Sequence, residues 1–371
     1  MEMELTPINV AMIAPTGAGK TSLLSTIVQY IKDNLNVADG FGIKPSNRKD
    51  EDVLNTFNSD LRAKIDAEDF KFESGFLAGT TVSRKFEFEI TLTSQADTEV
   101  KQKFVIMDIP GAWLDPTQRS NVPGWEEFKE HLYNSRIIWI PVEATVLMEV
   151  NQNSASEKGA SSKISCRDEI EELVKEWAQF RQKDGLPASA NFVITKCETY
   201  HSKDDSKGNI KASQCRDLFS KYYDEAIDRI RKECPQVEIS YVPVETVGCV
   251  KCIDSDWNTS EKDKPYLSCE YAVTSPHKRV IAGAESLVKP ILDYSVVQIQ
   301  AELNAMSSNA KKVLDEDNPF YILVDLVKGK RKAAKYTQSE VAKLVPCLEK
   351  LRDRLEQLRQ AGDQYKYYKH L

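Results

Sequence analysis

The stretch APTGAGKTS, residues 14–22, carries the residue types that bind a phosphate. It fits the Walker A pattern G-x-x-x-x-G-K-[ST], except that Ala14 stands where the first glycine is usual. Backbone N–H groups of such a loop surround an anion, its lysine adds a positive charge, and its hydroxyl binds Mg²⁺. A glycine turn at a strand end is the alternative interpretation. The candidate phosphate-binding residues are Thr16, Gly17, Ala18, Gly19, Lys20, Thr21 and Ser22.

Two later segments carry residues that would complete a magnesium and γ-phosphate site. The apolar run FVIM ends in Asp108-Ile-Pro-Gly111, where a carboxylate can hold Mg²⁺ through water and a glycine N–H can approach a phosphate. Thr81, in the segment LAGTT ahead of a strand, could ligate Mg²⁺ and sense the γ-phosphate. Each segment alone also fits an ordinary turn or strand start. The predicted metal ligands are Thr21, Thr81 and Asp108, and the predicted catalytic residues are Lys20, Thr81 and Gly111.

Two further strand ends carry residues suited to a purine base. NFVITKCE ends in Thr195, Lys196, Cys197 and Glu198. The lysine stem can stack on a purine, and the carboxylate can accept paired hydrogen bonds from the N1–H and amino group of guanine, which adenine does not offer. An ordinary charged strand end is the alternative. One strand later, the run YVPVETVG presents a loop that could cover the base, formed by Glu245, Thr246 and Val247.

These loops must be positioned by a sheet, and the spacing of apolar residues predicts one. Helical spacing recurs over five segments: 20–33, 125–133, 166–183, 211–234 and 283–306. Strand patterns lie between them, and the strands at 83–93 and 101–107 are predicted to form an antiparallel hairpin. The alternation indicates an α/β fold with a mostly parallel sheet covered on both sides, whose ligands bind at the carboxyl ends of the strands. Pro290 is expected to kink or break the last helix.

The sequence divides into a sheet domain, residues 1–306, and a C-terminal helical extension, residues 307–371. The sheet domain is interrupted by three predicted insertions, at 34–78, 143–165 and 248–280. The first is partly helical, the second includes a low-complexity polar loop at 151–165, and the third is a hairpin or irregular excursion. In the extension, leucines and a valine between 341 and 358 alternate three and four apart. This seam predicts packing on the chain's own sheet domain, with self-association or a partner helix as the alternative.

Composition limits the function classes. The chain has 371 residues, a net charge of −7, 41% hydrophobic and 29% charged residues, which is typical of a soluble globular protein and disfavours nonspecific nucleic-acid binding. No signal-peptide pattern or bilayer-length apolar run is present, so we expect a cytoplasmic protein. We expect its eight cysteines to be free thiols; a zinc site is the less favoured alternative, formed by Cys249, Cys252, Cys269 and His277.

Taken in order, APTGAGKT, AGTT, DIPG, TKCE and ETVG resemble the five nucleotide loops of the translation-factor class of P-loop GTPases, over residues 8–305. LAGTTVSRKFEFEI is similar to switch I of the tRNA-modification GTPases, in which the second threonine, here Thr81, senses Mg²⁺. The long first insertion and the late hairpin resemble bacterial double-GTPases of conflict and signalling clusters. The resemblance implies a G domain that binds Mg²⁺ and GTP or GDP and acts as a GTP-hydrolysing switch.

The sequence also departs from that family. The family's base motif, Asn-Lys-x-Asp, reads Thr-Lys-Cys-Glu here, so Glu198 is one methylene longer and the bracing amide of the asparagine is missing. Ala112 follows Gly111 where Ras-like proteins carry a water-positioning glutamine, and Gly17 replaces the asparagine of potassium-activated relatives. We therefore expect slow hydrolysis, accelerated by a residue supplied in trans or by dimerisation. Weak internal candidates, each expected to be solvated instead, are Arg84, Gln118 and Arg119.

Two other functions stay open. APTGAGKT also suits an ATPase motor or helicase, but that class predicts an acidic pair closing the second strand, whereas Ile109 follows Asp108. A nucleotide-stabilised scaffold without turnover is favoured by Ala112 and by the unusual base motif. The expected partners are a guanine nucleotide and a protein effector or activator, or a second copy of the chain bound through the G domain or the C-terminal helix.

Overall fold

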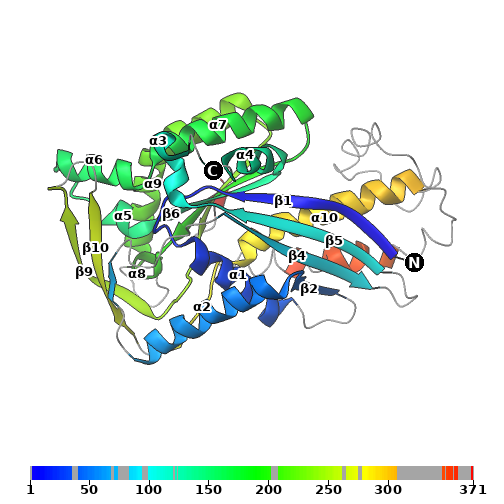
Figure 1. Ribbon diagram of the computed structural model, residues 1–371, viewed down its shortest axis with the longest axis horizontal. Coiled ribbons are helices and arrows are strands. Elements are labelled where there is room, and N and C mark those ends of the chain that lie inside the picture. Colours follow the sequence, from blue (N-terminus) through cyan, green and yellow to red (C-terminus); the bar gives the residue numbers. More distant parts are fainter. Residues whose placement is uncertain are drawn as a thin grey trace.

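A mixed sheet forms the centre of the computed structural model (Figure 1). Its strands are hydrogen bonded in the order β11-β8-β7-β6-β1-β5-β4-β2. The five central strands are parallel: β1 (Glu2–Met12), β5 (Glu99–Asp108), β6 (Ile137–Glu143), β7 (Ser189–Thr195) and β8 (Glu238–Pro243). Antiparallel strands lie at the edges: β4 (Arg84–Thr93), β2 (Phe41–Pro45) and the two-residue β11 (Lys369–His370). The predicted α/β fold, parallel sheet and antiparallel hairpin are confirmed.

The structure describes only part of the chain. The described residues are 2–35, 41–67, 71–73, 83–93, 99–119, 122, 124–201, 208–260, 265–274, 278–306, 345–346, 348–353, 355–357 and 369–370. Thr81, His277 and most of the segment 307–371 therefore lie outside the described residues.

Helices cover both faces of the sheet (Figure 1), because its central strands are apolar on both faces: every residue of β6 and β7 is buried. On one face, α1 (Lys20–Asn34) and α10 (Glu285–Met306) share a core with β1, β4 and β5. On the other face, the second core includes α4 (Gly124–Asn134), α7 (Arg167–Asp184) and α9 (Gly208–Glu233). This sandwich leaves the carboxyl ends of the parallel strands for loops.

Two of the predicted insertions pair with each other. The segment 34–78 supplies β2 to the main sheet, which was not predicted, and then α2 (Arg48–Asp66) and β3 (Lys71–Glu73). The segment 248–280 forms the hairpin of β9 (Val250–Asn258) and β10 (Tyr266–Val273), and β10 also pairs with β3. Leu61 and Ile65 of α2 share a small core with this hairpin. The two insertions therefore form one substructure beside the sheet.

The prediction of a polar loop at 151–165 is wrong. The residues Ala155–Ile164 form helix α6, which follows the short helix α5 (Ala144–Met148). The hydroxyl of Ser154 accepts a hydrogen bond from the N–H of Glu157 at 3.3 Å, so a Ser-x-x-Glu sequence caps the helix. Buried Ala160 and Ser161 provide its contact face. The polar composition of this segment favoured a loop, although Ser154 and Glu157 have the spacing of a helix cap.

The C-terminal third differs from two expectations. The helix α10 continues through Pro290 without a break, because buried Leu287 and Ile291 hold it on the sheet, so of the two outcomes expected at this proline only the kink stays a prediction. The extension was expected to be helical throughout, but Lys369–His370 pairs antiparallel to β8. Within the described ranges, no helix is long and apolar enough to cross a membrane.

The described part of the leucine seam packs on the chain's own sheet domain, as predicted. Every residue described between 345 and 357 is helical. Leu348 and Leu351 are buried in the same core as β4 and β5, and Leu355 packs against it. Lys350 donates a hydrogen bond to the carbonyl of Thr93 at 3.0 Å. This segment is therefore part of the sheet domain's core.

Because Leu351 is fully buried in that core, we expect Leu351→Ala to lower the free energy of unfolding by about 2–5 kcal/mol, the usual cost of such a cavity. Urea denaturation measures the change. Leu355→Ala, at a partly buried position, is the control and should cost less. An unchanged unfolding midpoint for Leu351→Ala would show that the helix does not dock on the sheet.

Candidate functional site

The Walker A residues form the loop between β1 and α1. Gly17 and Gly19 have φ angles of 85° and 82°, a left-handed conformation that glycine adopts without strain. Gly19 is also the N-cap of α1 and offers no side-chain hydrogen bond. The first N–H groups of a helix have no partner within the helix, so they remain suited to bind an anion at this loop.

Lys20 is buried beneath this loop. Its amine donates hydrogen bonds to the carbonyl oxygens of Ala14 and Pro15, both at 3.0 Å. Burial lowers the pKa of Lys20, while the negative charge of Asp108 opposes that shift. Asp108 is itself buried at the end of β5. The structure therefore brings the lysine of the loop and the predicted magnesium ligand into electrostatic contact.

Gly111 joins the DIPG turn to the phosphate loop by direct backbone contact. A Cβ atom at Gly111 would lie 2.0 Å from the nitrogen of Thr16 and 2.3 Å from the carbonyl carbon of Pro15. Only glycine allows this approach. The turn then continues as a short 3₁₀ helix, Gly111–Leu114, with Ala112 exposed.

Thr195 links the end of β7 to the phosphate loop. Its buried hydroxyl donates a hydrogen bond to the carbonyl of Ala18 at 2.8 Å and lies 3.3 Å from the carbonyl oxygen of Val142. A threonine hydroxyl at the end of β7 therefore holds this loop.

Lys196 follows with a φ of 52° and is held by an acidic residue that the sequence reasoning missed. Its amine lies 2.8 Å from Oε1 of Glu143, which is buried at the end of β6. Glu143 also accepts a hydrogen bond from the hydroxyl of Thr145 at 2.7 Å. The same reading of strand ends would have found Glu143, since it closes the buried run IIWIPVE.

Glu198 joins the base motif to the loop that follows β8. It begins the short helix α8 (Glu198–His201) and is buried. Its Oε1 accepts hydrogen bonds from the N–H groups of Thr246 and Val247 at 2.8 and 2.9 Å, and from the Thr246 hydroxyl at 3.4 Å. All of these bonds end on one oxygen, and Oε2 accepts none from a residue that the structure describes.

Four of the five predicted loops thus meet at the carboxyl ends of β1, β5, β7 and β8, and Thr81 of the remaining loop lies outside the described residues. Arg84, Gln118 and Arg119, the weak candidates for a residue that assists hydrolysis, were expected to be solvated. Arg84 and Gln118 are exposed, and the Gln118 amide donates to Asp115 at 3.4 Å. The guanidinium of Arg119 lies 4.7 Å from the centroid of the Trp125 ring. None of these contacts directs a side chain to the phosphate loop.

The described cysteines are free thiols, as predicted. Within the part of the chain described, no three His, Cys, Asp or Glu side chains are grouped to hold a metal ion. Two of the cysteines do meet, because the thiols of Cys252 and Cys269 are hydrogen bonded to each other across the hairpin. Cys249, Cys252 and Cys269 are not grouped as three metal ligands among the described residues, and the fourth residue of the zinc hypothesis, His277, lies outside them.

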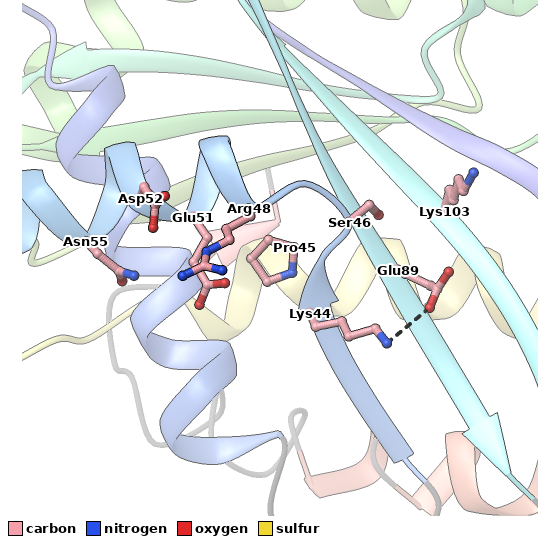
Figure 2. A pocket seen from close by; sticks show the side chains of 9 residues that line it. All are labelled: Lys44, Pro45, Ser46, Arg48, Glu51, Asp52, Asn55, Glu89 and Lys103. Atoms are coloured by element: carbon pink, nitrogen blue, oxygen red, sulfur yellow. Dashed lines mark ion pairs between the residues drawn. The ribbon is translucent and has the colours of Figure 1, made fainter.

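A pocket of about 810 Å³ lies on another part of the sheet (Figure 2). Its side chains come from α2 on one side and from β2, β4 and β5 on the other: Lys44, Pro45, Ser46, Arg48, Glu51, Asp52, Asn55, Glu89 and Lys103. The three basic and three acidic side chains balance, and Lys44 pairs with Glu89 at 3.6 Å. None of the predicted phosphate- or base-binding residues lines it, and its charge does not favour a phosphate.

The comparisons with known proteins do not identify this site. No protein-family model matches the chain, and no curated protein matches its sequence.

The contact at Gly111 can be tested through stability. A Cβ 2.0 Å from a backbone nitrogen forces the two loops apart, so we expect Gly111→Ala to lower the free energy of unfolding by about 1–3 kcal/mol. Gly159→Ala in α6 is the matched control. Its Cβ meets nothing within 4 Å, so it should instead add about 0.5–1 kcal/mol. Chemical denaturation of both variants checks this, and a fully stable Gly111→Ala would contradict the close approach.

Proposed function

We propose that this chain is a Mg²⁺-dependent GTP-binding protein that hydrolyses GTP to GDP and phosphate. The observation that carries the proposal is the pair of links that Thr195 and Glu198 make from one strand end. Thr195 holds the phosphate loop, and Glu198 holds the loop at Thr246 and Val247. The groups that we propose to bind phosphate and base are thereby held next to each other, as one nucleotide requires. The strand order, with β4 antiparallel beside β5, is consistent with the G domain that the sequence resembles.

The phosphates would bind at the start of α1. Backbone N–H groups of residues 16–22 would surround them, and the Lys20 amine would exchange the carbonyls of Ala14 and Pro15 for phosphate oxygens. The N–H of Gly111, next to Thr16, would sense the γ-phosphate. These groups stabilise negative charge, which is the main catalytic task in phosphoryl transfer.

The side chains beside the phosphate loop suit Mg²⁺. Thr21 is the second residue of α1, and Asp108 lies close enough to Lys20 to influence its pKa. Hydroxyl and carboxylate oxygens are the protein ligands that Mg²⁺ prefers. Thr21 and Thr81 would ligate the ion directly and Asp108 through water. The bound ion would neutralise charge on the β- and γ-phosphates.

The base would lie between Lys196 and the loop Glu245–Val247. The ion pair with Glu143 fixes the Lys196 stem, and the three hydrogen bonds on Oε1 leave Oε2 of Glu198 as the acceptor for a base. Guanine presents adjacent donors at N1 and at its amino group, and an ionised carboxylate is purely an acceptor. Adenine presents an acceptor at N1, so the arrangement favours GTP over ATP.

Hydrolysis by the isolated chain should be slow. Ala112 is exposed beside Gly111, and an alanine cannot orient water. A residue supplied in trans by a partner or by a second copy would complete the site; for comparison, a missing arginine finger costs about 10³ to 10⁵ in rate. Ala112 equally supports the second candidate, a scaffold that binds GTP without turnover.

Removing the Lys20 amine tests whether the chain binds a nucleotide, which both candidate functions require. Lys20→Ala should weaken GTP binding by roughly 10- to 100-fold, since it deletes charge-assisted hydrogen bonds to phosphate. Calorimetric titration with GTP and ATP measures this, and Lys232→Ala, at an exposed site in the last turn of α9, is the control. Wild-type preference for ATP would overturn the guanine assignment. Tight GTP binding without turnover, even with cell extract added, would favour the scaffold.

Glu198→Gln tests how the base is read. Its amide oxygen can still accept the N–H groups of Thr246 and Val247, while its NH₂ group replaces Oε2 with a donor. We expect GTP binding to weaken by roughly 10- to 100-fold, because a mismatched buried hydrogen bond costs about 1–3 kcal/mol. The affinity for ATP should be unchanged or higher, as measured by competition titration. Equal losses for both nucleotides would mean that Glu198 only supports the loop.

A further inference from the structure

The peptide unit at Thr246 is held from both sides by charged groups. Its N–H donates to the carboxylate of Glu198 at 2.8 Å, and its carbonyl accepts a hydrogen bond from Nε of Arg279 at 2.8 Å. Arg279 lies 33 residues further along the chain, beyond the β9–β10 hairpin, and was not among the predicted site residues. A loop residue bound between an anion and a cation has little freedom to move.

The other nitrogens of Arg279 anchor this loop to two helices. Nη2 donates to the hydroxyl of Thr26 on α1 at 2.9 Å, and Nη1 donates to the side-chain oxygen of Asn58 on α2. The hydroxyl of Ser25, the neighbour of Thr26, donates to the same oxygen of Asn58. One guanidinium therefore connects the loop after β8, the helix that follows the phosphate loop, and the helix of the first insertion.

The charge on this guanidinium persists at neutral pH. Burial and, to a smaller extent, the charge of Arg62 lower the pKa of Arg279 to about 10, while Glu198, Cys249 and Asp33 oppose the shift. A group with a pKa near 10 is still almost fully protonated at pH 7, so all the donors of the guanidinium are retained.

Backbone pairing supports the same contact. Glu245 and Ala282 exchange two hydrogen bonds, at 3.0 and 3.3 Å, and the N–H of Val280 donates to Val247 at 3.0 Å. Gly248, with a φ of 74°, allows the approach, because a Cβ there would lie 2.2 Å from the carbonyl oxygen of Val280. The segment 279–282 thus lines the loop 245–248 along its length.

We propose that Arg279 is a positioning residue for the base-binding loop 245–247 and that it slows the release of the bound nucleoside. The inference rests on the proposed nucleotide site but not on hydrolysis. The loop must move aside when a covered base leaves, and that motion breaks the bonds that Arg279 makes to Thr246, Thr26 and Asn58. Arg279 contacts the phosphate loop only through Thr26 among its described contacts, and the Thr26 hydroxyl donates to the carbonyl of Ser22 at 2.7 Å. Because this carbonyl is not one of the N–H groups suited to phosphate, the effect of Arg279 should fall on the base.

The test compares release of the whole nucleotide with binding of its phosphates alone. Dissociation of fluorescent N-methylanthraniloyl-GDP is followed by stopped flow, and inorganic tripolyphosphate affinity is measured by titration. The variants are Arg279→Lys, which keeps the charge but not the fork of donors, and Thr26→Val, which removes the α1 anchor together with the hydrogen bond that the Thr26 hydroxyl donates to the carbonyl of Ser22 at 2.7 Å. Arg181→Lys is the matched control, because Arg181 also donates to a backbone carbonyl, that of Tyr133, and is even more buried than the partly buried Arg279.

We expect Arg279→Lys to speed GDP dissociation by roughly 10-fold or more, since hydrogen bonds to a charged group are lost, and Thr26→Val to have a smaller effect. Tripolyphosphate affinity should stay unchanged in Arg279→Lys, and Arg181→Lys should match the wild type in both measurements. An unchanged dissociation rate in Arg279→Lys, or a parallel loss of tripolyphosphate binding, would overturn the inference. If the wild type binds only the adenine analogue, the guanine assignment fails and the same comparison with that analogue still tests Arg279. If the wild type binds neither the guanine nor the adenine analogue, both the proposed nucleotide site and the role of Arg279 are overturned.

Discussion

The hydrogen bond from the Thr195 hydroxyl to the carbonyl of Ala18 joins two loops that are 177 residues apart in sequence. One loop carries the groups suited to phosphate, and the other leads within three residues to Glu198. This hydrogen bond can form because β1, β6 and β7 are parallel neighbours, so their carboxyl ends are adjacent. Both partners are buried, and an unpaired buried carbonyl would be costly, which makes this register of the two loops the stable one.

The two insertions support the part of the candidate site that the proposed function assigns to the base, around the loop 245–247. The hairpin of β9 and β10 separates the loop 245–248 from Arg279, yet backbone pairing returns the chain to that loop immediately after the hairpin. The first insertion meets the hairpin through β3 and meets Arg279 through Asn58. Segments that look peripheral in the sequence therefore support the loop that the proposed function assigns to the base.

The local parts of the site were predictable from sequence, and its long-range supports were not. The Walker A loop, Asp108 and the base motif each follow a buried strand, so strand patterns and residue chemistry located them. Arg279 and β2 depend on partners in distant segments, which no local pattern specifies. The helix α6 was missed for a different reason: its polar composition outweighed the Ser154-x-x-Glu157 cap that nucleates it.

The two halves of the site differ in how completely the protein holds them. On the base side, Lys196 pairs with Glu143, and the Thr246 peptide is bound by Glu198 and Arg279. On the phosphate side, the Lys20 amine is held by backbone carbonyls of its own loop. A preorganised half binds without paying for reordering, whereas the other half must exchange partners when a ligand arrives. Under the proposed function, the base side supplies steady affinity, and the rearrangement that distinguishes nucleotide states is confined to the phosphate side, around Lys20, Asp108 and Gly111.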